Sequence, residues 1–253
     1  MRLRLALAAC VAAALPAPAA AQQWHHVHLR STDAQAARAW YIEHMGTEPR
    51  GATNVRMGGT AINLWERDAG FPPSSGGVLD HIGFSVEDIE ATMARLEAAG
   101  VEIVRDVFEV FGLKVAFVRD PWGTTVEIAQ DHDRLGFQHV HAYVSDPEAA
   151  VEWFVTMFGG TPTPFLGRVP SVDYEETWIM FSPAGDRPRA PSEGRSFDHI
   201  GFTVDDMEAT LERLGSLGVE VTEGPRPSRS GTATVAYVAG PDGIRIELLE
   251  PGR

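Results

Sequence analysis

Cysteine and basic residues are scarce in this chain of 253 residues. The one cysteine, Cys10, lies close to the N-terminus, so the rest of the chain can hold no disulfide, thiol nucleophile or thiolate-bound metal. Lysine and arginine number 21 against 35 acidic residues, which gives a formal net charge of −14. A surface this acidic repels phosphate backbones and anionic lipids, so the composition argues against nucleic-acid and membrane-surface partners.

Long hydrophobic runs are also missing, and no stretch approaches the roughly 20 apolar residues that a membrane helix needs. The apolar run 5–15 follows a basic start and precedes the small residues 19–21. This order is typical of a secretory signal. We therefore expect residues 1–21 to be removed and the mature protein to be periplasmic or secreted. The segment around Cys10 also resembles a lipoprotein box, which makes a lipid-anchored protein the alternative.

An internal repeat organises the remaining residues. Residues 80–103 return at 198–221 with 15 of 24 positions identical. The stretch 25–49 returns at 138–162 with nine of 25 identical, and 113–130 returns at 233–250 with six of 18. The order is kept, so the chain is one domain written twice. We expect the two domains at 24–130 and 137–250.

Each half divides again into two units that begin with an apolar strand and continue into a helix. In the second unit Ile89, Met93 and Leu96 recur at helical spacing and Gly100 follows as a stop. Short β-rich runs then follow each helix. The pattern predicts an α+β fold of four strand–helix–strands modules, at 24–66, 78–130, 137–182 and 197–250.

Six of the nine histidines and two glutamates occupy repeat-equivalent positions. Burying such groups without partners is costly, so their repetition needs a chemical reason. Two imidazoles and one carboxylate suit Zn, Mn, Ni, Co or Fe(II) and leave positions open for substrate. Taking each half as a domain, we predict one or two divalent ions. The candidate ligand sets are His26, His81 and Glu127, and His139, His199 and Glu247.

A further pair, His28 and His141, lies two residues beyond the first ligand of each set and therefore on the same strand face. Each is a candidate catalytic residue, as a general acid/base or as a group that orients substrate. Two alternatives stay open: a hydrogen-bonded residue of the sheet, or a ligand in place of its neighbour. The histidines that do not repeat are interpreted as surface residues: His25, His44 and His132.

These motifs resemble the vicinal oxygen chelate superfamily, which includes glyoxalase I, bleomycin-resistance proteins and extradiol dioxygenases. The resemblance covers residues 24–250. It is carried by His26-Val27, Asp80-His81-Ile82-Gly83-Phe84 and Asp120-Pro121-Trp122-Gly123 leading to Glu127, and by their copies His139-Val140, Asp198-His199-Ile200-Gly201-Phe202 and Pro241-Asp242-Gly243 leading to Glu247. It implies βαβββ modules paired into two cup-shaped domains around a divalent metal. The substrate would chelate that metal through two adjacent oxygens.

Departures from the well-known branches narrow what the resemblance implies. Glyoxalase I has an additional metal-binding Glu, and the aligned positions here are about Asn63 and Trp178. Extradiol dioxygenases carry a Tyr before Asp-Pro-x-Gly. The second half keeps it as Tyr237, a further candidate catalytic residue, but has Gly240 for the Asp, and the first half has Phe117 for the Tyr.

The function we expect is a metal-dependent enzyme, a lyase, isomerase or oxidatively cleaving enzyme, that acts on a small oxygen-rich substrate. The alternative is non-catalytic binding or sequestration of a small molecule, as in bleomycin-resistance proteins. A homodimer is compatible with both. Segments 104–112 and 222–231 differ between the halves. If they are loops over the cup mouths, the two sites prefer different ligands.

Overall fold

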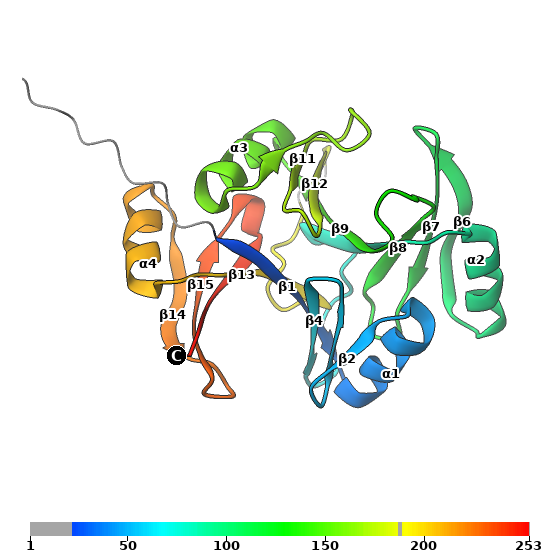
Figure 1. The fold of residues 1–253 in the computed structure, drawn as a ribbon, viewed down its shortest axis with the longest axis horizontal. Helices are drawn as coiled ribbons and strands as arrows, with labels where there is room; N and C mark the ends of the chain where they lie inside the picture. The colour runs from blue at the N-terminus through cyan, green and yellow to red at the C-terminus, as the bar shows by residue number, and fades with distance from the viewer. Residues whose placement is uncertain (1–21, 187–188, 253) are drawn as a thin grey trace, which may run out of the picture.

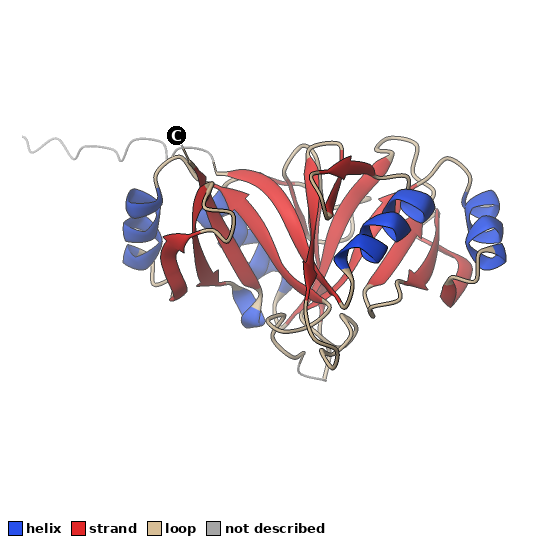
Figure 2. Ribbon diagram, turned by 90° about the horizontal axis from the view of Figure 1, so that it is seen from below, coloured by secondary structure: helices blue, strands red, loops and turns tan. Residues whose placement is uncertain are grey.

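The computed structural model describes residues 22–186 and 189–252, so the expected signal segment and Cys10 lie outside the described residues. Within the described residues the chain has four α-helices and sixteen strands, which form two eight-stranded sheets. Figure 2 shows two curved sheets side by side, with helices at both ends of the molecule. Among the described residues, no helix is long and apolar enough to cross a membrane.

All four modules have the expected order, one strand, one helix and three strands. The first comprises β1 (Gln23–Ser31), α1 (Ala34–Met45), β2 (Glu48–Arg50), β3 (Asn54–Met57) and β4 (Thr60–Glu66). The second comprises β5 (Leu79–Ser85), α2 (Ile89–Ala98), β6 (Glu102–Val110), β7 (Leu113–Arg119) and β8 (Thr125–Ala129). The third comprises β9 (Gly136–Val144), α3 (Pro147–Phe158), β10 (Thr161–Pro162), β11 (Ser171–Asp173) and β12 (Trp178–Pro183). The fourth comprises β13 (Phe197–Thr203), α4 (Met207–Ser216), β14 (Val221–Pro227), β15 (Ala233–Ala239) and β16 (Arg245–Pro251).

Every helix begins in the same way, at an aspartate whose carboxylate accepts a backbone N–H of the first turn. These N-caps are Asp33, Asp88, Asp146 and Asp206. Each such cap stabilises a helix by about 1 kcal/mol. In α3 the next residue is Pro147, whose missing N–H costs nothing at this position. The repeated capping residues start each helix directly after the first strand of its module.

The sheets pair modules in a way that differs from the expected one. The first sheet has the order β14-β15-β16-β13-β1-β4-β3-β2, and the second has the order β10-β11-β12-β9-β5-β8-β7-β6. The first module therefore shares a sheet with the fourth, and the second shares one with the third. The expectation that each contiguous half forms its own cup was wrong, because the central antiparallel ladders join β1 to β13 and β5 to β9 across the halves. Figure 1 shows β1 beside β13 near the middle of the fold.

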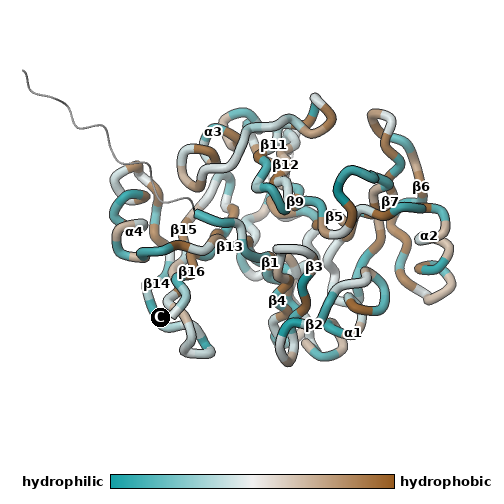
Figure 3. The backbone as a smooth tube through the Cα atoms, in the orientation of Figure 1, coloured by the Kyte–Doolittle hydropathy of each residue, from teal (hydrophilic) through white to brown (hydrophobic). Residues whose placement is uncertain are grey.

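The strands of both sheets have one face in the core and one face that carries the polar residues of interest. In β1, Val27 and Leu29 are buried in the hydrophobic core. His26 and His28 alternate with them along the strand and therefore project from the other face. Figure 3 shows the hydrophobic stretches of strands such as β7. The alternation makes each sheet a rigid platform for its histidines.

The segments 104–112 and 222–231 are mainly strand and not loop. Most of each belongs to an outermost strand of its sheet, β6 or β14. Both strands are largely exposed, and an edge strand needs no hydrophobic alternation, which is why their composition resembled loops.

Candidate metal centres

Two groups of histidine and glutamate converge, one on each sheet. We call them the first centre, made by His26, His28, His199 and Glu247, and the second centre, made by His81, Glu127, His139 and His141. In each, one ligand atom per residue lies within 4.8 Å of all the others. All six predicted metal ligands are present, but the predicted grouping was wrong, because His26 lies with His199 and Glu247 and not with His81 and Glu127. The exchanged modules of the two sheets cause this difference.

Strand register brings the first centre together. His28 on β1 is opposite His199 on β13, and Glu247 on β16 is paired with Gly201 on β13. The imidazole of His26 lies directly over Gly201, where a Cβ atom would overlap the ring. Glycine at this position therefore allows the His26 ring to approach Glu247.

The second centre repeats this construction. His81 on β5 is opposite His141 on β9, and Glu127 on β8 is paired with Gly83 on β5. The ring of His139 covers Gly83 as His26 covers Gly201. Each Asp-His-Ile-Gly-Phe motif thus provides one histidine ligand. Two residues later, its glycine leaves space for the histidine ligand of the neighbouring strand.

The ligand atoms of the first centre gather around one carboxylate oxygen. Glu247 Oε2 lies 2.8 Å from His199 Nε2, 3.6 Å from His26 Nε2 and 3.5 Å from His28 Nδ1. His28 Nδ1 is also 2.5 Å from His199 Nε2. All four side chains are buried. A carboxylate and three imidazole nitrogens therefore converge in a largely buried cluster.

The second centre is similar but more open. Glu127 Oε2 lies 3.1 Å from His81 Nε2 and 3.6 Å from His139 Nε2. Glu127 and His141 are half-buried, unlike their counterparts. His141 Nε2 is hydrogen-bonded to Ser182 Oγ at 2.8 Å.

Two imidazole nitrogens, one at each centre, show whether a metal ion fits. The Nε2 atoms of His26 and His139 are buried and have no hydrogen-bond partner among the described residues. Leaving a buried polar atom unpaired costs about 1–3 kcal/mol. A divalent ion coordinated by these nitrogens removes that cost at both centres, and imidazole with carboxylate is a donor set that such ions accept.

In four of the ligand histidines the second ring nitrogen, Nδ1, is hydrogen-bonded to a neighbouring side chain. His199 Nδ1 lies 2.6 Å from Asp198 Oδ1, and His81 Nδ1 lies 3.0 Å from Asp80 Oδ1. Asp198 is itself held by Arg30 and Arg245. Such contacts orient the rings so that Nε2 faces the metal position.

His25 and Gln138 occupy the equivalent place beside the other two ligands. His25 Nδ1 is 2.8 Å from His26 Nδ1, and Gln138 Oε1 is 3.0 Å from His139 Nδ1. The interpretation of His25 as a mere surface residue was therefore wrong. The sequence repeat could have indicated this role, because His25 aligns with Gln138 and both side chains can form hydrogen bonds.

Electrostatics leaves both carboxylates and two of the imidazoles in the protonation states that suit metal ligands. Burial alone would raise the pKa of Glu127, but His139 and His81 outweigh it and hold the pKa well below its usual range. Glu247 is affected in the same way, with burial opposed by His199 and His26. Burial lowers the pKa of His28 and of His141, which favours neutral imidazoles. Ionised carboxylates and neutral imidazoles are the metal-binding forms.

In the metal-free protein one imidazole of each centre is instead stabilised as a cation. Burial lowers the pKa of His81, but hydrogen bonds to Asp80 and Glu127 outweigh it and raise that pKa to about 9. The pKa of His199 is also raised, with burial opposed by Asp198 and Glu247. An entering metal ion therefore displaces a proton from each centre.

Tyr237 lies next to the first centre. Its hydroxyl donates to Glu247 Oε2 at 3.0 Å, and its ring is 5.2 Å from that of His199. Phe117 holds the same register position beside the second centre, opposite Glu127, with its ring 5.2 Å from that of His81. The first centre thus has a polar partner for its carboxylate that the second lacks.

Strand register also corrects one alignment. Asn63 pairs with His28, and the residue paired with His141 is Met180, whereas Trp178 pairs with His139 and corresponds to Ala61. Asn63 and Trp178 are therefore not equivalent, because the segments between helix and last strand differ in length in the two modules. None of these four positions carries a carboxylate.

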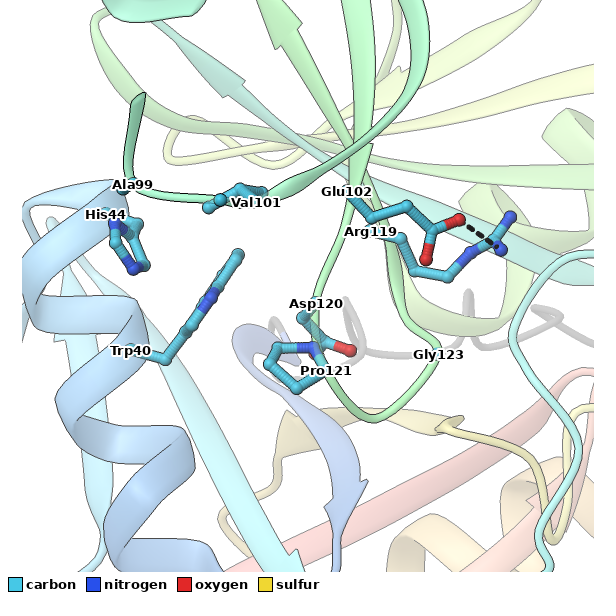
Figure 4. Close-up of a pocket in the computed structure, with 10 residues that line it drawn as sticks. Trp40, His44, Ala99, Val101, Glu102, Arg119, Asp120, Pro121 and Gly123 are labelled. Atoms are coloured by element: carbon cyan, nitrogen blue, oxygen red, sulfur yellow. Dashed lines mark hydrogen bonds and ion pairs between the residues drawn. The ribbon is translucent and has the colours of Figure 1, made fainter. Parts of the chain in front are cut away.

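A separate pocket of about 500 Å³ lies on the outer side of the molecule between α1 and the β7–β8 turn (Figure 4). It is lined by residues such as Trp40, Arg119 and Asp120 and by none of the ligands of either centre. Asp120 has a structural role here, since its carboxylate accepts hydrogen bonds from the Tyr41 hydroxyl and the Trp122 amide. The Asp-Pro-Trp-Gly motif is thus a turn that packs two modules of one half together.

Comparison with known proteins supports this picture. The model of the Glyoxalase/Bleomycin resistance protein/Dioxygenase superfamily matches residues 23–128 and 136–248. A probable lactoylglutathione lyase of Vibrio cholerae is 27% identical over 125 residues, which cover 44% of this chain and 88% of that protein. The lactoylglutathione lyase of Arabidopsis thaliana is 25% identical over 132 residues, 47% of this chain and 46% of that protein. The match therefore spans less than half of the Arabidopsis relative.

Solved structures resemble the whole fold. Glyoxalase I from Zea mays superposes with a TM-score of 0.75 at 18% identity and covers 90% of this chain and 92% of its own. A putative dioxygenase from Bacillus subtilis has a TM-score of 0.66 at 16% identity and covers 93% and 87%. At these identities the likeness concerns the fold alone.

Proposed function

Because the chain belongs to the Glyoxalase/Bleomycin resistance protein/Dioxygenase superfamily, we propose that it is an enzyme with a divalent metal ion at each of its two centres. Its substrate is a small molecule that offers two adjacent oxygens. Relatives named as lactoylglutathione lyases support an enzyme over a sequestering protein.

The observation that carries the proposal is the set of buried, unpartnered Nε2 atoms around Glu127 and Glu247. In a binding pocket without metal these nitrogens would stay unpaired, and each would lower the stability of the folded state by its full desolvation cost. The set occurs twice, on two sheets that share the same register.

Each centre offers up to four protein ligands, because His28 and His141 lie within the same clusters as the predicted triads. We assign both as the fourth ligand, the alternative to their catalytic role. These four residues would hold a divalent ion such as Fe(II), Mn or Ni, which accepts more than four ligands and would therefore also bind substrate oxygens. When bound, such an ion polarises these oxygens as a Lewis acid or, as iron, supplies redox chemistry.

The residues around the ligands have supporting roles in this proposal. Asp80 and Asp198 hold the rings of His81 and His199 with Nε2 toward the metal position. Tyr237 keeps its proton, because burial and the charge of Glu247 raise its pKa, and its hydroxyl donates a hydrogen bond to Glu247. Neither β4 nor β12 supplies a carboxylate base at the register positions of the ligands, so proton transfer in a lyase or isomerase reaction must use another group.

We also propose that the chain is exported, on the basis of its basic start, short apolar run and Ala19–Ala21. Mass spectrometry of the mature N-terminus from a periplasmic fraction tests this. A start at Gln22 supports export, and an intact Met1 in the cytosol contradicts it.

The metal content of the purified protein tests the proposed function. We expect about two ions per chain by elemental mass spectrometry. Glu127→Gln and Glu247→Gln should each retain about one ion, whereas His132→Ala, at an exposed histidine outside both clusters, should retain both. A chain that binds no Zn, Mn, Ni or Fe(II) after incubation would contradict the proposal and favour metal-free small-molecule binding.

A further inference from the structure

The two centres have equivalent ligands but unlike surroundings, and we infer that they bind different classes of ligand. The second centre accepts chelating ligands that carry a flat aromatic or apolar group. The first centre accepts small, anionic chelating ligands. This inference rests on the proposed function, because the chelating oxygens need the ion.

Strand register defines which residues correspond. Trp178 pairs with His139 as Ala61 pairs with His26, so the last strand of each module carries a large ring at one centre and a methyl group at the other. Phe108 pairs with Val115, and at the equivalent place Arg226 pairs with Val235. The remaining equivalent pairs are Met180 with Asn63, Phe117 with Tyr237, and Ser182 with Trp65.

Aromatic side chains flank the second centre on both sides. On one side the Phe117 ring lies 5.2 Å from His81 and is stacked on Phe108 at 6.1 Å. On the other side Trp178 contacts Phe165, with ring centroids 5.1 Å apart, and its buried Nε1–H has no partner among the described residues. Arg134 lies over Trp178, but its charge is balanced by Asp173. The Arg105 guanidinium covers Phe108, so a flat ring next to the metal would contact mainly Phe117 and Trp178 and find an unused donor.

Polar and cationic groups take the same places at the first centre. Arg50 donates to Asn63 Oδ1 at 3.3 Å, and the Tyr237 hydroxyl points at Glu247. Arg226 lies 5.9 Å from the Tyr237 ring, with its charge balanced by Glu223, so Arg50 provides the cationic charge at this centre. These groups favour a ligand with negative charge.

Trp65 also limits the size of what the first centre accepts. Its ring lies 4.1 Å from His28 and 5.3 Å from His199, with the Arg67 guanidinium 4.4 Å above it. The corresponding residue at the second centre is the smaller Ser182, which is bonded to His141, while the Tyr143 ring stacks on His141 at 5.3 Å. The Trp65 ring over His28 explains why all four ligands of the first centre are buried while two at the second are half-buried.

The test measures ligand affinity at one centre at a time. Glu247→Gln leaves the second centre, and Glu127→Gln leaves the first. Each variant is loaded with Mn(II) and titrated with 4-nitrocatechol, an aromatic ring with adjacent oxygens, and with oxalate, a small dianion with adjacent oxygens. We expect the ratio of the two affinities to differ at least tenfold between the variants, with 4-nitrocatechol favoured by Glu247→Gln.

A second substitution locates the cause. Added to Glu247→Gln, Trp178→Ala should weaken 4-nitrocatechol binding by roughly three- to tenfold, which is the usual value of one aromatic contact, and leave oxalate binding unchanged. The matched control is Trp65→Ala added to Glu127→Gln, which removes a cover and should not weaken either ligand. Metal content confirms that each variant still holds one ion.

The outcomes separate the two proposals. One ion in each variant with the same ratio of affinities would overturn this inference and leave the proposed function intact. An unchanged 4-nitrocatechol affinity in the Trp178→Ala variant would also overturn it. Variants and parent that all bind no metal would overturn the proposed function and this inference together.

Discussion

A single carboxylate decides how a histidine presents itself to a metal in this protein. Asp198 is fully buried, accepts hydrogen bonds from Arg30 and Arg245, and holds His199 by Nδ1. Asp80 does the same for His81 with the help of Arg189. Because each imidazole has two nitrogens, fixing one determines which atom is left for the metal. The position of Asp directly before His is therefore part of the site.

The hydroxyl of Tyr237 gives the first prediction at this scale. Tyr237→Phe removes the hydrogen bond to Glu247 and should weaken metal binding at the first centre by roughly tenfold, as expected for a residue that orients a ligand. Competition with a chelator of known affinity measures the change. The matched variant Phe117→Tyr places a hydroxyl at the same register position of the second centre. It should tighten binding there, and equal affinities in all three proteins would contradict this role.

The second prediction concerns Asp120, whose burial raises its pKa to about 6. Between pH 3.8 and about 6 the folded state therefore keeps this proton, whereas the unfolded chain has lost it. The free energy of unfolding consequently declines as the pH rises from about 4 through 6. Asp120→Asn keeps an oxygen for the Trp122 and Thr124 amides but does not titrate. The variant should gain about 2 to 3 kcal/mol relative to the parent between pH 4 and 7.

Denaturant unfolding of both proteins across this pH range measures that difference. Comparison at each pH cancels the contributions of the other carboxylates, several of which have lowered pKa values and act in the opposite direction. A constant difference between pH 4 and 7 would show that Asp120 does not titrate in this range.

At the scale of the element, each ligand-bearing strand needs a gap in its neighbour. The centre of β13 provides His199 and then, two residues on, Gly201 beneath the His26 ring. The centre of β5 provides His81 and Gly83 in the same order beneath His139. Residues two apart share a strand face, so the ligand and the gap belong to one surface.

Substitution of either glycine tests this construction. Gly201→Ala places a methyl group against the buried His26 ring, which must move away from Glu247. We expect loss of one metal ion and about 1–3 kcal/mol of stability, and Gly83→Ala should do the same at the second centre. Gly215→Ala in α4 is the control, because nothing lies near its Cβ position. That change should leave both ions and raise stability by up to about 1 kcal/mol. Two ions in Gly201→Ala would contradict the proposed geometry.

On the scale of the whole molecule, the two centres connect parts of the chain that are far apart in sequence. The first centre joins His26 of the first module to Glu247 of the last, and the second joins the two middle modules. Neither ligand set can exist before its sheet has formed. A bound ion therefore stabilises the folded state only, and its binding free energy adds to the free energy of unfolding.

Metal removal tests this coupling. An ion present at 1,000 times its Kd contributes about 4 kcal/mol, which for a chain of this size raises Tm by about 10 °C. We expect chelation with EDTA to lower Tm by at least that amount. Glu127→Gln and Glu247→Gln should each remove about half of the shift. Thermal unfolding followed by circular dichroism measures it, and an unchanged Tm after complete metal removal would contradict the coupling.

Local patterns in the sequence were sufficient to predict the modules and the identity of the candidate ligands. Hydrophobic alternation, the capping aspartates and the repeat depend on local preferences and on similarity within the chain, so the βαβββ order could be predicted from them. The ligand types followed because His-x-His recurs only in odd-numbered modules and Asp-His with a later Glu only in even-numbered ones. Each centre therefore needs one module of each kind.

Which modules share a centre depends on long-range strand pairing and could not be predicted from local patterns. Pairing the first module with the second or with the fourth satisfies the same local patterns, because the choice depends on backbone hydrogen bonds between β1 and β13 and between β5 and β9. Such edge-to-edge pairing leaves no mark in a single sequence. The same reason hid the register that separates Asn63 from Trp178. The sequence indicated which side chains could bind a metal, and long-range strand pairing determined which of them lie together.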